Sequence, residues 1–258
     1  MTEILVRITK ILLLISSVLT SREIRWNKYD PDQFSYQNEQ NITYEDDRYD
    51  VMQGIDVSEH QGEIDWEEVA DAGYDFVIVR AGYRGYGEEG RLMEDTMAVE
   101  YLQDAKEAGL QVGAYFFSQA LDEKEAREEA RFAIGTVISS GVKLDLPLFY
   151  DPETIPGEEG RADDISSEQA VRNAAAFCDT VETAISCDAG IYANLEWEVT
   201  RYNAALMSAY DIWYAGYEPV PKSPYHFEWW QYSERSEVPG IDGAMDLNLW
   251  IREKEEQE

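Results

Sequence analysis

Two acidic residues separated by a single residue lie at the end of an apolar run, in the stretch Leu148-Phe149-Tyr150-Asp151-Pro152-Glu153. Side chains alternate across a β-strand, so Asp151 and Glu153 share one face of the predicted strand. Pro152 has no backbone N–H to give a sheet ladder, which indicates that the strand ends here. A carboxyl that holds a proton beside a charged carboxylate is the arrangement that cleaves a glycosidic bond. The spacing also fits two acids that merely cap a loop, so the pair alone does not establish a catalytic site.

Two further acids end or begin apolar runs elsewhere in the chain. Asp56 closes Gly54-Ile55-Asp56, and Asp246 lies in Ala244-Met245-Asp246-Leu247-Asn248. A lone Asp at a strand end is more often a turn or hydrogen-bond anchor than a catalyst. If the first and last strands become neighbours in a closed barrel, the two acids share a rim with Asp151 and Glu153.

Aromatic residues recur on the same apolar runs. Sugar rings pack their apolar faces on aromatic side chains and direct their polar edges to side chains such as Gln231. Most of these rings, taken singly, belong to a core. The predicted pocket residues are Tyr115, Phe117, Tyr192, Trp213, Trp230 and Gln231.

Eight short apolar runs predict the strands that must position these residues. They are residues 51–58, 76–83, 111–120, 146–153, 188–194, 210–217, 227–233 and 244–250. Segments of helical character separate the earlier runs, with capping residues such as Asp122 and Ser166 and terminating glycines such as Gly141. The segment from Glu218 to Tyr225 is too short and too rich in proline for a crossover helix, so the last strands should pack partly antiparallel.

The predicted fold class is therefore α/β, an irregular TIM-like barrel with about (β/α)5 followed by three further β-strands. The barrel is expected to span residues 51–252, with a charged tail at 253–258. Residues 1–20 carry Arg7 and Lys10 ahead of a short apolar run, which predicts an export signal or a short membrane anchor. Residues 21–50 are polar without a period of 2 or 3.6, which predicts a flexible polar tether.

Composition excludes several function classes. The chain has 258 residues and a formal net charge of -32, which repels nucleic acid and anionic lipid surfaces. Membrane contact is thus expected only through the N-terminal anchor. The only histidines are His60 and His226, so no metal site of zinc spacing is expected. A disulfide between Cys178 and Cys187 is left open. We expect a monomer.

Taken together, these motifs resemble those of the family 25 glycoside hydrolases, the muramidases often called Chalaropsis-type lysozymes. The resemblance runs from about Met52 to Trp250 and rests on five stretches in order. They are Gly54–Gly62 with Ile64-Asp65-Trp66, Gly113–Phe117, Tyr150–Glu153, Trp230–Ser233 and Val238–Asn248.

The resemblance implies hydrolysis of the β-1,4 bond between N-acetylmuramic acid and N-acetylglucosamine in peptidoglycan, with no cofactor. It implies that Glu153 is the general acid. Asp151 would steady an oxazolinium formed by the substrate's own acetamido group, and Asp56 and Asp246 would be the remaining site acids. Such an enzyme is expected to be secreted or attached to a bacterial cell surface.

Two alternatives remain at this point. One is a cell-wall sugar-binding barrel that has lost turnover. The other is a chitinase-like glycosidase, although the D-x-x-D-x-D-x-E run typical of those enzymes is absent.

Overall fold

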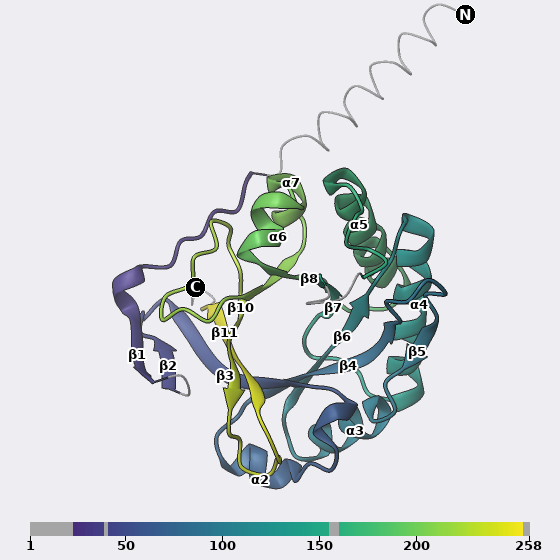
Figure 1. Ribbon diagram of the computed structural model, residues 1–258. Helices are drawn as coiled ribbons and strands as arrows, with labels where there is room; N and C mark the ends of the chain where they lie inside the picture. The colour runs from purple at the N-terminus through teal and green to yellow at the C-terminus, as the bar shows by residue number, and fades with distance from the viewer. Residues whose placement is uncertain (1–22, 39–40, 155–159, 255–258) are drawn as a thin grey trace, which may run out of the picture.

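Eight strands close into a barrel-like sheet at the centre of a mixed α/β fold (Figure 1). The computed structural model describes residues 23–38, 41–154 and 160–254. The sheet runs in the order β3-β11-β10-β9-β8-β7-β6-β4, and β3 pairs with β4 to close it. The strands are β3 (Tyr49–Val57), β4 (Phe76–Arg84), β6 (Gln111–Ser118), β7 (Leu148–Pro152), β8 (Ala189–Asn194), β9 (Asp211–Ala215), β10 (Trp229–Ser236) and β11 (Met245–Glu253). All eight predicted strands therefore form. The short β5 (Leu92–Glu94) extends the sheet beside β4.

Helices cover much of the outer surface of this sheet (Figure 1). They are α2 (Trp66–Asp71), α3 (Ala98–Glu107), α4 (Glu123–Ser140), α5 (Ser167–Ala184), α6 (Leu195–Thr200) and α7 (Ala204–Met207). Asp122 and Ser166 cap α4 and α5 by accepting backbone N–H groups, and Gly141 ends α4 in the left-handed conformation, as predicted. The segment after β8 forms two short helices, α6 and α7, because Asn203 starts α7 with a cap of its own.

Among the eight barrel strands, only the last, β11, runs against its neighbours. Each strand from β3 to β10 runs parallel to its barrel neighbour. β11 is antiparallel to both β10 and β3, which confirms that the last strands pack partly antiparallel. The described chain between β9 and β10 forms no helix, consistent with its prolines.

The barrel interior is filled mainly by aromatic rings. Phe76, Phe149, Trp229 and Trp250 form its base, with Trp229 stacked on Trp250 at 5.5 Å between ring centroids. Glycines on the inward faces make room for them. A Cβ at Gly54 would lie 2.5 Å from the Phe76 ring, and one at Gly190 would lie 2.4 Å from the Phe149 ring. Above this apolar base, the inward residues become polar.

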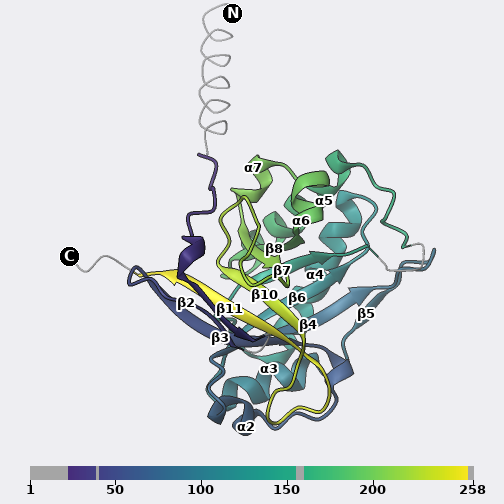
Figure 2. The ribbon, with the colours of Figure 1, turned by 60° about the vertical axis from the view of Figure 1, so that its left-hand side comes forward.

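The segment expected to be a flexible tether is folded wherever it is described. Residues 23–50 contain the 3-10 turn η1 (Pro31–Gln33) and a hairpin of β1 (Phe34–Asn38) and β2 (Asn41–Tyr44). The Tyr29 hydroxyl contacts the carbonyl oxygens of Phe227 at 2.6 Å and Ile251 at 3.2 Å. Figure 2 shows the hairpin beside β3 and β11, on the opposite side of the barrel from α4. The hairpin covers a part of the outer face of the barrel sheet that none of the described helices covers.

Three other expectations concern the ends of the chain and its cysteines. The predicted export signal or anchor at 1–20 lies outside the described residues. Of the helices within the described ranges, none is both long and apolar enough to cross a membrane. Cys178 and Cys187 are free thiols, and Cys178 is buried on the core face of α5.

Candidate active site

Four carboxylic acids gather at the rim where the parallel strands end. Asp56 comes from β3, Asp151 from β7, Glu153 directly follows β7, and Asp246 comes from β11. All four line one cavity of about 370 Å³. The carboxyl ends of barrel strands are where enzymes of this architecture keep their sites, because the loops there can vary without disturbing the packed interior.

Asp56 and Asp246 form a pair across the closure of the barrel. They lie directly opposite each other on the antiparallel strands β3 and β11, and their carboxyl groups share a hydrogen bond. Burial and the negative charge of Asp56 raise the pKa of Asp246 to about 9. Asp246 therefore keeps a proton at neutral pH and can share it with Asp56.

Two amide side chains fix the orientation of Asp56. Asn248 Nδ2 and Gln231 Nε2 both donate to Asp56 Oδ2, at 2.8 and 2.9 Å. The Trp213 indole N–H can only donate, and it binds Asn248 Oδ1 at 2.8 Å. Since that contact requires an acceptor, the amide of Asn248 must turn its N–H groups toward Asp56.

The Gln231 amide is oriented in the same way by hydroxyl groups. Tyr217 donates to Gln231 Oε1 at 3.1 Å, and the Tyr192 hydroxyl lies 3.0 Å from the same oxygen. Its Nε2 is thereby left to face Asp56. Burial raises the pKa of Asp56, and the two chains of donors that end on one of its oxygens limit this rise because they favour the ionised form.

Glu153 and Asp151 are both protonated more readily than exposed acids. Burial raises the pKa of Glu153, the charge of Asp56 adds to this, and a hydrogen bond with Tyr192 opposes both. Burial and then the charge of Glu153 raise the pKa of Asp151 well above its ordinary value. Arg80 also lines the cavity, and its positive charge opposes the rise at Asp151. A carboxyl that retains its proton at neutral pH is suited to general acid catalysis.

The cavity continues into a neighbouring groove of about 760 Å³. Glu153, Tyr192, Tyr217 and Glu234 line both spaces. The half-exposed Tyr217 ring stands where they join. A cleft made of two joined spaces suits a polymer better than a small metabolite. Within the described ranges, no group of three or more His, Cys, Asp or Glu side chains is arranged to hold a metal ion.

Comparison with known proteins gives a consistent result. Residues 55–241 match the sequence profile of the glycosyl hydrolases family 25. This chain belongs to that family.

Relatives of this family 25 chain include the autolytic lysozyme of Clostridium acetobutylicum, which is 28% identical over 198 residues. The match covers 76% of this chain but 55% of that protein, so the chain spans about half the length of this relative. The uncharacterized protein YegX of Escherichia coli O157:H7 is 30% identical over 215 residues, or 80% of this chain and 72% of YegX.

Solved structures agree on the fold. The bacterial lysozyme from Streptomyces coelicolor superposes with a TM-score of 0.62 at 26% sequence identity, covering 76% of this chain and 90% of that one.

The family 25 barrel brings nearly all of the predicted site residues together. Those that line the cavity are Glu153, Asp151, Asp56, Asp246, Tyr115, Phe117, Tyr192, Trp213 and Gln231. Trp230 does not, and its prediction as a pocket residue is corrected. Side chains alternate along β10, so Trp229 and Gln231 face the interior while Trp230 faces outward. There the Trp230 ring packs on Phe34 of the N-terminal hairpin, and its N–H binds the Gly216 carbonyl oxygen.

The family 25 site also contains residues that the sequence did not single out, among them Arg80, Asn248 and Tyr217. Arg80 is the one charged residue in Phe76-Val77-Ile78-Val79-Arg80-Ala81, and an isolated charge in such a run is a usable indication. Asn248 shares the alternation of Asp246 on the last strand. Tyr217 follows the end of β9, and nothing in its local sequence distinguishes it from the other aromatics.

Proposed function

We propose that this family 25 chain is an N-acetylmuramidase that hydrolyses the β-1,4 bond between N-acetylmuramic acid and N-acetylglucosamine in peptidoglycan. The observation that carries the proposal is the joint burial of Glu153 and Asp151 in a cavity that continues into a neighbouring groove. The names of two relatives, autolytic lysozyme and Lysozyme M1 of Streptomyces globisporus, support the same activity.

In this mechanism Glu153 is the general acid. Because burial raises its pKa, the carboxyl holds its proton more readily than an exposed acid and can give it to the departing glycosidic oxygen. The resulting carboxylate can then take a proton from the water that completes hydrolysis.

Asp151 is proposed to stabilise the positively charged intermediate. Its Oδ1 is buried and has no hydrogen-bond partner among the described residues, so an N–H of the substrate's acetamido group would satisfy it. In the free site, burial favours the protonated form of Asp151. Positive charge on a cyclised acetamido group would favour the carboxylate instead, and the charge of Asp151 would in turn stabilise that intermediate.

Asp56 and Asp246 are proposed to set the charge of the rim. Together they hold a shared proton beside the reacting sugar, so their pair contributes about one negative charge rather than two. Tyr115, Phe117, Tyr192 and Trp213 would form apolar walls for sugar rings. Gln231 has both ends of its amide engaged, so we assign it to holding Asp56 rather than to binding sugar directly.

Digestion of purified peptidoglycan tests the proposal. The wild-type protein should release reducing sugars, and mass analysis of the fragments should find N-acetylmuramic acid at the new reducing ends. Glu153→Gln should lower the rate by about 10²–10⁴-fold, the usual contribution of a general acid. N-acetylglucosamine at the reducing ends would favour a chitinase-like glycosidase. Binding without release by either protein would favour a silent sugar-binding barrel.

We also infer that the barrel is the irregular TIM-like form, (β/α)5 followed by three strands. Helices that follow β3, β4, β6, β7 and β8, and the lack of one between β9 and β10 in the described chain, support this. Because peptidoglycan lies outside the cytoplasmic membrane, we propose that the protein is secreted or displayed on the bacterial surface. We also propose that it is a monomer. Mass analysis of the mature protein would show whether residues 1–20 are removed.

A further inference from the structure

We propose that Gln119 is a positioning residue for Glu153, an inference that rests on the proposed role of Glu153 as general acid. The Gln119 side chain is fully buried just beyond the end of β6. Its Nε2 donates to the carbonyl oxygen of Glu153 at 3.0 Å, and its Oε1 accepts the backbone N–H of Ala162 at 3.3 Å. One amide therefore ties the main chain of Glu153 to the main chain that precedes α5.

Glu153 needs such a support because the sheet no longer holds it. The last pair between β6 and β7 joins Ser118 to Pro152, and Glu153 lies one residue beyond. A main chain released from its ladder can rotate, and a rotation at Glu153 would move its carboxyl away from Tyr192 and Asp151. The amide of Gln119 replaces the missing ladder bond at this position.

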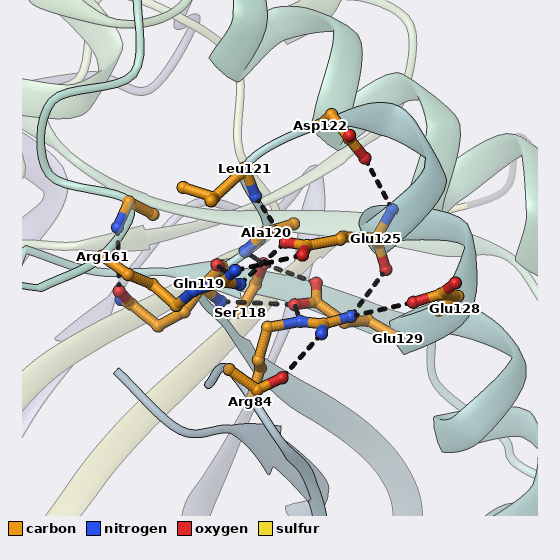
Figure 3. Close-up of polar contacts among 12 residues, drawn as sticks. Arg84, Ser118, Gln119, Ala120, Leu121, Asp122, Glu125, Glu128, Glu129 and Arg161 are labelled. Carbon is orange, nitrogen blue, oxygen red and sulfur yellow. Dashed lines mark hydrogen bonds and ion pairs between the residues drawn. The ribbon is translucent and has the colours of Figure 1, made fainter. Parts of the chain in front are cut away.

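The backbone of Gln119 is itself fixed on both sides (Figure 3). Its N–H donates to Glu129 Oε1 at 3.4 Å, and its carbonyl oxygen accepts from Arg161 Nη1 at 3.0 Å. Arg161 also forms an ion pair with Glu125 at 2.7 Å. All four polar groups of Gln119 are thus engaged, which leaves its side chain a single orientation.

A buried ion pair lies beneath this arrangement. Arg84 Nε binds Glu129 Oε1 at 2.7 Å, and Ser118 Oγ donates to Glu129 Oε2 at 2.6 Å. Arg84 also donates to the carbonyl oxygens of Gly90 and Glu125. In Figure 3 these side chains converge from β4, the end of β6 and the first turns of α4. A satisfied polar network of this kind is rigid, because each member loses several bonds if it moves.

The test compares Gln119→Met with Asn173→Leu. Each variant removes one fully buried amide of similar size. Asn173 donates to the carbonyl oxygen of Ala120, next to Gln119, and has no bond to Glu153. Asn173→Leu therefore controls for loss of buried polar contacts without loss of the proposed support.

Gln119→Met should lower kcat on peptidoglycan by about tenfold or more while KM changes little, because misplacing a catalytic group acts on the chemical step. Burial raises the pKa of Glu153, so a Glu153 freed toward solvent should titrate at lower pH. The alkaline limb of the kcat/KM profile should accordingly move to lower pH in Gln119→Met and stay in place in Asn173→Leu. Equal kcat and equal pH profiles in the two variants would overturn the proposal.

Hydrogen exchange gives a readout that does not depend on activity. Without Gln119 Oε1, the Ala162 amide proton should exchange faster in Gln119→Met than in the wild type or in Asn173→Leu. Unchanged exchange of the Ala162 amide proton would contradict the proposed support of Glu153 by Gln119, whether or not the wild-type protein digests peptidoglycan. A wild-type protein that digests no peptidoglycan would separately refute the proposed function. If Gln119→Met does not fold, Arg161→Met serves as a second variant. It removes the hydrogen bond to the Gln119 carbonyl oxygen and the ion pair between Arg161 and Glu125, and it leaves the Gln119 side chain in place. It should produce smaller shifts in the same direction, and their absence would overturn the proposal.

Discussion

Replacing Asp246 by Asn should stabilise the protein, and the gain should grow with pH. Asp246 keeps its proton in the folded state up to about pH 9, whereas in the unfolded chain it ionises with an ordinary pKa of 3.8. Between these values the unfolded state loses a proton that the folded state retains. Folding is therefore penalised increasingly as the pH rises through this window, and Asn, which cannot ionise, removes the penalty.

The size of the effect follows from the width of that window. Each pH unit above the unfolded pKa costs at most ~1.4 kcal/mol, which sets an upper limit of ~4 kcal/mol at pH 7. Asp246 is partly exposed and shares its proton with Asp56, and both features reduce the penalty. We expect Asp246→Asn to gain about 1–2 kcal/mol at pH 7, and less at pH 5.

Denaturant unfolding at pH 5, 6, 7 and 8 measures this gain. Asp242→Asn is the matched control, because it makes the same Asp-to-Asn change at an exposed position in the loop between β10 and β11, four residues before Asp246. The control should stay within about 0.5 kcal/mol of the wild type. A gain for Asp246→Asn that does not exceed the control, or that stays constant from pH 5 to 8, would contradict a retained proton on Asp246.

Three further changes probe the supports of the site and the fold. Trp213→Phe removes the N–H that orients Asn248, so kcat/KM on peptidoglycan should fall about tenfold, the effect of one lost hydrogen bond, and an unchanged value would count against the donor chain to Asp56. Arg84→Met leaves the buried Glu129 without its counter-charge and should cost about 3 kcal/mol or more in denaturant unfolding. The double variant with Glu129→Met should recover most of that loss, and a double variant as unstable as the single one would argue against the ion pair. Tyr29→Phe removes the hydroxyl contacts that join the N-terminal segment to the barrel and should lower stability by about 1–2 kcal/mol. No change in its unfolding midpoint would show that this hydroxyl does not hold the segment.

The strands could be predicted because each is covered on both faces. Residues 111–120, for example, were expected to form a strand, and β6 spans Gln111–Ser118. Aromatic rings fill the inside, and helices or the N-terminal hairpin cover the outside, so each strand forms an apolar run in the sequence, bounded by turns and glycines. The four acids could be placed because each lies at an end of such a run.

The same two-sided burial explains why Trp230 was misplaced. Apolar residues on both faces of β10 hide which face points inward, so Trp229 and Trp230 are equivalent in the sequence. The folded segment before β3 was missed for a different reason. Its burial depends on Tyr29 and Phe34 packing on Phe227 and Trp230, near the other end of the chain, and no local period reports such contacts.

The hydrogen-bond partners of the side-chain amides in the site could not be predicted from the local sequence either. Asn248 receives its orientation from Trp213, which is 35 residues away. Gln119 reaches Glu153 across 34 residues of chain. Only the closure of the barrel brings these groups together.

The central claim, that Glu153 donates the proton to the leaving oxygen, is tested most directly by changing the leaving group. Wild type and Glu153→Gln should be compared on peptidoglycan and on a glycan fragment that carries a dinitrophenyl leaving group, which departs without protonation. Glu153→Gln should lose about 10²–10⁴-fold on peptidoglycan and less than about tenfold on bond cleavage in the activated substrate. An equally large loss on both substrates would contradict the assignment of Glu153 as the general acid.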